Sequence, residues 1–461
     1  MNSEKVDACP DIFPDYTEVT VPSTIAPLNF TVNEKFDKIR TEIFDSTGNR
    51  IFISGNNEIL IPAKKWKNIL EANKGGKIHI AVSISNNDRW KAYKAFPVYV
   101  SDAPIDEGLA YRLIAPGYEI YGKMGIYYRN LSNFEQRALI ENTLAYPSCM
   151  NCHSFKQTSA DSMSLHFRGD FGGTLLQIGG RSEILALKND SMIANAVYPY
   201  WHPTGKYIAY SANKTIQAFH AARDKRIEVM DTASDVIVYD VENRRILMTP
   251  LLKTENFETF PSFSPDGKTL YFSCAKKKNI PAEYNEIRYD LCSVDFDPTT
   301  GTFGNTIDTL IKAASTGKSA SCGRPSYNGK YLMYTLSDYG NFPIWHKEAD
   351  LWLLDLKTGE TRELSEANSS DTESYHSWSS NSRWFVFGSR RADGLYTRPY
   401  IASIDENGRV GKPFLVPQKH TDYYRDLLYS FNIPEFVTGK IRLDLSEIEK
   451  KLMSKKRVEV F

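Results

Sequence analysis

The chain has 461 residues, and its 56 Lys and Arg residues balance 56 Asp and Glu residues, so the formal net charge is zero. This length exceeds one ordinary core and predicts two or three domains. The lack of a basic excess argues against nucleic acid as the main partner. The longest apolar runs, such as 351–354, are far shorter than the roughly 20 residues of a transmembrane helix, so we expect no membrane span. Aromatic residues make up 13% of the chain, which favours a mainly β protein.

The first hundred residues predict an extended lead-in followed by a small β domain. Residues 1–23 carry three prolines and scattered acids, and we interpret them as extended. Between 24 and 103, short β-type runs alternate with turn-forming residues, as at 39–54, where a hairpin is expected. One short helix is expected at 63–72. Several strands in about 80 residues predict an immunoglobulin-like β-sandwich.

Residues 104–148 are interpreted as a connector with a short helix. The segment Ser132-Asn133-Phe134-Glu135 has the form of a capping box, which predicts a helix from there to about Asn142. At the other end of the chain, residues 441–461 are expected to form a helix or a tail.

The strongest architectural signal is an internal repeat between residues 149 and 440. A pattern of strand, tight turn and strand recurs at 199–211, 261–273, 324–334 and 377–387. The step from Gly205 to Gly267, and from Gly267 to Gly329, is 62 residues. A further strand follows each copy, and four strands at such a period predict a β-propeller blade. Residues 153–155 match 261–263, which adds a fifth candidate blade, and 428–437 provide a closing strand or part of a sixth.

The segment Ser264-Pro265-Asp266-Gly267-Lys268 and its degenerate copies resemble the repeat of TolB-type, WD-repeat-like propellers. The resemblance covers about 150–440. It implies a five- or six-bladed propeller after the sandwich, and it implies a fold only, because propellers carry many different functions.

One short motif indicates chemistry. Cys149-Met150-Asn151-Cys152-His153 is C-x-x-C-H, the attachment motif of c-type haem, in which two thiols bind the porphyrin and the imidazole binds the iron. The alternatives are a redox-active or zinc-binding cysteine pair. Zinc needs two more ligands, and a thioredoxin-like site needs a βαβ context that the sequence lacks. We therefore predict one covalent haem c, with His153 as its proximal ligand.

The second axial ligand of that iron has several candidates. We favour His166, because it follows His153 by 13 residues on the next predicted strand of the same blade. His220, in an apparent insertion, and Met163 are the alternatives, although each of the three is also a plausible packing or surface residue. Arg168 shares the predicted strand face of His166 and is a candidate partner for a haem propionate.

The motif predicts a monohaem c-type cytochrome for electron transfer or haem-based sensing, with a redox partner protein or a membrane-associated complex. One alternative is a propeller scaffold that binds a protein or a glycan, with a structural cysteine pair. The other is a peroxidase-like enzyme that uses His166 and Arg168. The resemblance to c-type cytochromes implies export, to the periplasm or as an outer-membrane lipoprotein whose signal segment is absent from this sequence.

Overall fold

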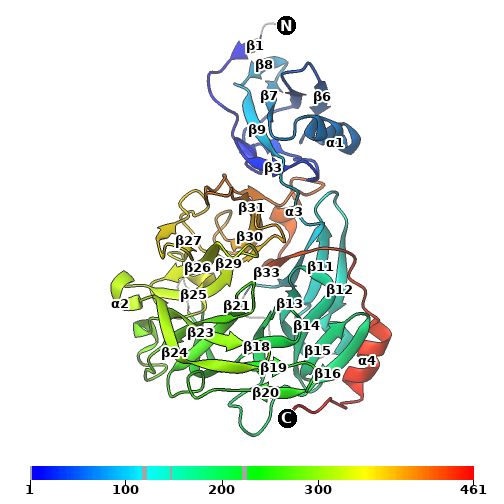
Figure 1. Ribbon diagram of the computed structural model, residues 1–461. Helices are drawn as coiled ribbons and strands as arrows, with labels where there is room; N and C mark the ends of the chain where they lie inside the picture. Colours follow the sequence, from blue (N-terminus) through cyan, green and yellow to red (C-terminus); the bar gives the residue numbers. More distant parts are fainter. Residues whose placement is uncertain (1–2, 117–121, 146–147, 221–225) are drawn as a thin grey trace.

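The computed structural model describes residues 3–116, 122–145, 148–220 and 226–461. The fold is mainly β, with a smaller N-terminal part packed on a propeller-like arrangement of sheets (Figure 1). No helix among these residues is long and apolar enough to cross a membrane.

The N-terminal part is built on one mixed sheet of seven strands. These are β1 (Ser3–Lys5), β3 (Thr20–Pro22), β5 (Lys38–Phe44), β6 (Arg50–Gly55), β7 (Lys77–Asn86), β8 (Arg89–Ala92) and β9 (Phe96–Ser101). The strands β2 (Ile12–Phe13) and β4 (Thr31–Val32) form a separate pair. The predicted hairpin is confirmed as β5 and β6. The immunoglobulin-like sandwich is not confirmed, because the main strands form a single sheet.

The short helix expected at 63–72 is confirmed as α1 (Ala63–Ala72). Its apolar residues Trp66, Ile69 and Leu70 are buried, as expected for a helix that covers one face of a sheet. The Trp66 indole N–H also donates to the Ile25 carbonyl at 3.0 Å, which fixes the helix to the loop after β3.

The helix expected from Ser132 to Asn142 is wrong. Residues Gln136–Glu141 form strand β12, and Asn142–Ala145 form a single 3-10 turn. The side chain of Asn130 accepts hydrogen bonds from the Ser132 backbone N–H and hydroxyl, so the apparent capping box begins with an Asx-turn. Pairing of β12 with β11 (Gly125–Asn130) outweighs the local helix signal.

The described residues after the N-terminal part form four separate four-stranded sheets, arranged as blades, and one eight-stranded sheet. The first sheet holds β10 (Gly108–Ile114), β11, β12 and β33 (Ser430–Val437). The second holds β13 (Ser148–Lys156), β14 (Ser159–Gly169), β15 (Gly173–Ile178) and β16 (Arg181–Leu185). The third holds β25 (Ser319–Pro325), β26 (Tyr331–Ser337), β27 (Asp350–Asp355) and β28 (Thr361–Glu363). The fourth holds β29 (Glu373–Trp378), β30 (Trp384–Ser389), β31 (Arg398–Ser403) and β32 (Phe414–Leu415).

The eight-stranded sheet consists of two consecutive runs of four strands. One run is β17 (Ala196–Trp201), β18 (Tyr207–Phe219), β19 (Ile227–Asp240) and β20 (Arg245–Leu247). The other is β21 (Phe257–Phe263), β22 (Thr269–Ala275), β23 (Asp290–Asp297) and β24 (Thr302–Ile311). One parallel bridge, between Ser234 and Phe257, joins β19 to β21.

The two ends of the propeller region meet in one sheet. Strand β33, close to the C-terminus, pairs with β10, which immediately follows the N-terminal part. The described strands within 104–148, β10, β11 and β12, therefore belong to a blade rather than to the predicted connector. The inner strands β13, β17, β21, β25, β29 and β33 contact one another in this order, and β33 contacts β13. The helix α4 (Leu445–Met453) then packs Ile448 and Leu452 into the core of the β13 sheet.

The N-terminal part and the propeller share one apolar core. Trp384 of β30 is fully buried in a cluster that contains residues of both, and its indole N–H donates to the Pro104 carbonyl at 2.9 Å. The Ser380 backbone N–H donates to the Asp106 carboxylate at 2.8 Å beside it. These contacts fix the N-terminal part against the blade that carries β29 and β30.

We therefore predict that Trp384→Ala destabilises the protein by about 3–5 kcal/mol, because it leaves a cavity and an unpaired carbonyl at this junction. Trp384→Phe keeps an aromatic ring there and is expected to have a smaller effect. Urea unfolding followed by near-UV circular dichroism measures both variants. A Trp384→Ala protein with wild-type stability would show that the two parts do not depend on this contact.

Candidate functional site

Each of the six inner strands turns at one residue in the left-handed backbone conformation. The φ angles of these residues lie between +49° and +58°. At the same place, each inner strand has two residues opposite one residue of its neighbour, which defines a β-bulge. We name these the bulge residues: Cys152, Tyr198, Phe260, Cys322, Tyr375 and Ile433.

The six bulge residues surround the axis of the propeller. All six line one cavity, of about 30 Å³, which we name the inner cavity. His153, Pro199, Pro261, Gly323 and Arg324 complete its lining. A volume of this size holds about two water molecules.

The C-x-x-C-H motif lies on β13, the inner strand of its blade. Cys149 is half-buried at the start of the strand, opposite Arg168, whereas Cys152 is the bulge residue and is 2% exposed. Cys152 is thus equivalent to Cys322 on β25. His153, one residue further on, is equivalent to His376 on β29. The motif therefore coincides with ordinary positions of the repeated inner strand.

His153 is buried without a hydrogen-bond partner. Neither ring nitrogen makes a hydrogen bond with a described residue, and Nε2 lies 3.9 Å from the Glu435 carboxylate. Burial, and then the nearby guanidinium groups of Arg112 and Arg324, lower the pKa of His153 to about 3, although the Ala110 and Ile433 carbonyls favour protonation. The imidazole is neutral at physiological pH.

The candidates for a second iron ligand lie in different places. His166 is on β14, opposite Asn151, and its Nδ1 bonds with the Thr174 hydroxyl at 3.0 Å. Met163 is fully buried in the apolar core of the same blade. His220 follows the end of β18 and stacks on Tyr284, with ring centroids 6.4 Å apart. Arg168 is close enough to favour the thiolate of Cys152, but burial raises the pKa of that thiol.

The residues of the motif, as folded here, do not fit a haem. The cavity beside Cys152 and His153 holds about two water molecules, whereas a porphyrin is many times larger. Cys149 and His153 also lie in extended backbone on either side of the bulge, with Cys152 turned into the axis. Haem attachment therefore stays a prediction of the motif.

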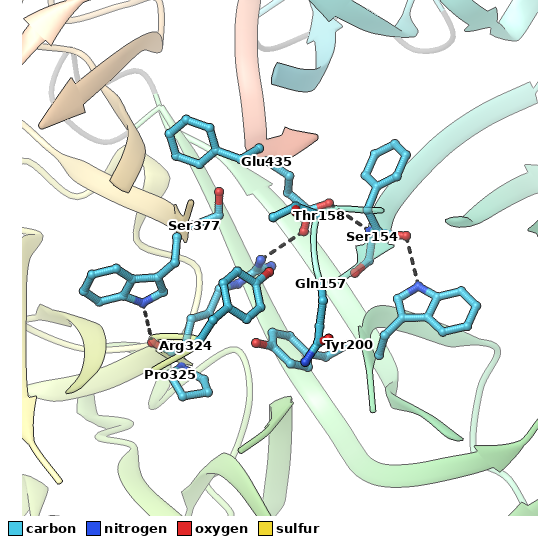
Figure 2. Close-up of a pocket in the computed structure, with 13 residues that line it drawn as sticks. Ser154, Gln157, Thr158, Tyr200, Arg324, Pro325, Ser377 and Glu435 are labelled. Carbon is cyan, nitrogen blue, oxygen red and sulfur yellow. Dashed lines mark hydrogen bonds and ion pairs between the residues drawn. The ribbon is translucent and has the colours of Figure 1, made fainter. Parts of the chain in front are cut away.

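A second pocket lies further along the same axis (Figure 2). The residues two positions after the bulge residues are Ser154, Tyr200, Ser262, Arg324, Ser377 and Glu435. All of these except Ser262 line this pocket, together with Gln157, Thr158 and Tyr327. We name it the mouth pocket. Its volume is about 30 Å³, and Arg324 lines both it and the inner cavity.

The mouth pocket contains an ion pair between the half-buried Arg324 and the buried Glu435. Arg324 Nη1 donates to Glu435 Oε1 at 3.0 Å, and its guanidinium lies 5.7 Å from the centre of the Tyr200 ring. Burial raises the pKa of the Glu435 carboxyl, although Arg324 favours the charged form. Two tryptophans fix the surrounding backbone, because Trp201 Nε1 donates to the Ser154 carbonyl and Trp378 Nε1 to the Arg324 carbonyl.

None of the motifs in the sequence predicts this pocket. Arg324 and Glu435 are 111 residues apart, and nothing in the local sequence pairs them. A usable signal did exist in the repeat, because the copies at 261–263 and 377–378 have serine where the copy at 324–325 has arginine. A charge at a position that is otherwise small and uncharged in these copies indicates a role outside packing.

Comparisons with known proteins give little beyond this geometry. No protein-family model and no curated protein match the chain. A DUF4784 family protein from Bacteroides caccae ATCC 43185 is 9% identical, over 76% of this chain and 94% of that chain, with a TM-score of 0.31. A prolyl endopeptidase structure is 11% identical over 67% and 42%, with a TM-score of 0.35. A chain of a mitotic checkpoint complex is 12% identical over 69% and 94%, with a TM-score of 0.33. Similarity this distant assigns no function.

The fit of the motif can be tested directly. We expect protein produced in a host with a cytochrome c maturation system to have the mass of the unmodified polypeptide and no haem absorption, because β13 is packed as an inner strand. A known c-type cytochrome produced in the same cells is the control. Covalent haem that disappears in Cys149→Ala/Cys152→Ala would show that this strand rearranges around the cofactor.

A second prediction concerns acid stability. Burial, and then Arg168, lower the pKa of His166 to about 3, so between about pH 6.5 and pH 3 the unfolded chain binds a proton there that the folded protein does not. Wild type should therefore lose stability relative to His166→Gln as the pH falls through this window, by up to about 1.4 kcal/mol per pH unit. Urea unfolding of both proteins over the pH range measures the difference. A constant difference would mean that His166 is solvated.

Proposed function

We propose that this protein is a binding protein whose propeller receives one polar side chain of a protein partner in the mouth pocket. The observation that carries the proposal is the Arg324–Glu435 ion pair at the centre of that pocket. An ion pair such as this one, with one partner buried and the other half-buried, contributes little to stability on its own, because desolvation offsets its attraction. Its position on the propeller axis, beside a pocket with a polar lining, supports a role in recognition.

The pocket has the layout of a recognition site. Gln157 is exposed and Tyr327 is half-buried at the rim, whereas Ser154, Ser377 and Glu435 are buried in the floor. Arginine and glutamate together provide donors and acceptors, so a side chain that carries both, such as an amide, can bond with each. The strands that supply these residues are held in a closed ring, so the site is preorganised.

The size of the pocket favours a protein partner over a glycan. A volume of about 30 Å³ accepts the end of one side chain but not a sugar ring. The two tryptophans of the lining, Trp201 and Trp378, are both 3% exposed and present no open ring face on which a sugar could stack. Tyr200 already faces the Arg324 guanidinium.

We propose that the eight-stranded sheet counts as two blades, which gives a six-bladed propeller of the TolB-like type. Six equivalent bulges and the closed order of inner strands support this number. The haem-based functions, and the export that follows from them, depend on the C-x-x-C-H motif and are separate from this binding function.

Selection from a random peptide library with immobilised wild-type protein tests the binding function. Selected peptides are expected to lose at least about tenfold in affinity against Tyr327→Ala and Arg324→Gln, measured by calorimetry. Tyr331→Ala is the matched control, because Tyr331 is also a half-buried tyrosine but lines a different hollow of the same blade.

Peptides that bind all three variants equally would contradict the proposal. So would failure to select any peptide, together with retention of the protein on an oligosaccharide array. Circular dichroism of each variant confirms that a loss of affinity is not a loss of fold.

A further inference from the structure

The axis of the propeller contains more positive charge than the neighbouring carboxylate balances. Arg112 of β10 is 9% exposed. Its Nη1 donates to the Asn151 side-chain oxygen at 2.7 Å and to the Met150 carbonyl at 3.3 Å, and its Nε has no partner. The Asn432 amide is oriented so that its nitrogen donates to the Phe431 carbonyl, and its oxygen then accepts from Arg112 Nη2 at 3.1 Å. All of these neighbours are neutral, and Arg112 forms no ion pair with a described carboxylate.

One carboxylate at this level cannot neutralise two guanidinium groups. Glu435 pairs with Arg324 and lies 3.9 Å from His153 Nε2, which is neutral. With Arg112 and Arg324 both charged, one positive charge is left over. A buried charge without a counter-charge is unfavourable, so this arrangement calls for an anion.

Two further charged groups lie near the inner cavity, and they have opposite signs. Arg168 is half-buried and acts on the Cys152 thiol. Asp231 acts on Tyr198 and accepts hydrogen bonds from the amide groups of Asn213 and Asn341. Their charges offset each other, so the excess positive charge remains.

The inner cavity has both the size and the donors for a small anion. It is lined by the guanidinium-bearing Arg324 and by His153, a side chain that is 2% exposed. The Ala110 and Ile433 carbonyls lie near the His153 ring, but neither ring nitrogen makes a hydrogen bond of good geometry with a described residue. A neutral imidazole has one N–H to donate. About 30 Å³ accommodates one monatomic anion in place of two water molecules.

We propose that the inner cavity is a binding site for a small monovalent anion of the halide class, such as chloride. Arg324 and the N–H of His153 bond with the ion, and Arg112 supplies the counter-charge from behind the cavity wall. The ion fills the inner cavity at the centre of the ring of bulge residues and stabilises the closed propeller. This site shares Arg324 with the mouth pocket, but it requires no partner bound there.

Thermal unfolding at increasing chloride concentration tests the site. Gluconate replaces the missing chloride in each sample, so that the ionic strength and the screening of protein charges stay constant. The unfolding midpoint of wild type should rise with the logarithm of the chloride concentration. Arg112→Gln should reduce the apparent chloride affinity by at least about tenfold. His376→Gln should keep the wild-type response, since His376 occupies the equivalent strand position but bonds with the Met333 carbonyl and lines neither cavity.

A bromide-soaked crystal of wild type keeps the proposal testable if Arg112→Gln does not fold. The expected result is an anomalous peak in the inner cavity, within hydrogen-bond distance of Arg324 and His153. A midpoint that does not respond to chloride, bromide peaks only on the surface, or an equal loss of the response in His376→Gln would each overturn the proposal.

Discussion

The backbone turn at the bulge residue is the constraint on which the rest of this molecule depends. Each inner strand turns inward at a residue with φ near +50°, and the same turn places a side chain on the axis. This conformation is unfavourable for residues such as Tyr198 and Ile433, most of all for a β-branched one. It persists because six strands impose it on one another around a closed ring. The inner cavity and the mouth pocket both follow from this repeated bulge.

Much of the fold could be predicted from local sequence, because its elements are built from local signals. The turn residues around Gly267 and Gly329 identified blades, and the short helix expected at 63–72 is present as α1. Prediction failed where a distant strand decides the outcome. Residues Gln136–Glu141 carry a helix-like pattern, but β10 and β11 complete a sheet with β33 from the far end of the chain. No local window contains that information.

The site shows a different limit of sequence analysis. The C-x-x-C-H motif is contiguous in the sequence and predicts one site, yet its residues occupy positions that every inner strand has, where Cys322 and His376 also occur. Aligning the repeat through the bulge, rather than through its glycine turn, would have revealed this. The pair Arg324 and Glu435 could not be predicted, because the ring alone brings β25 and β33 to the same axis.

Thiol labelling of the native protein, resolved by peptide mass spectrometry, tests most directly whether β13 is an inner strand like the others. Cys9 is exposed and serves as the internal reference, whereas Cys152 and Cys322 occupy equivalent bulge positions. This account predicts fast labelling of Cys9 and similar, strong protection of Cys152 and Cys322. Labelling of Cys152 at the rate of Cys9, with Cys322 still protected, would contradict it.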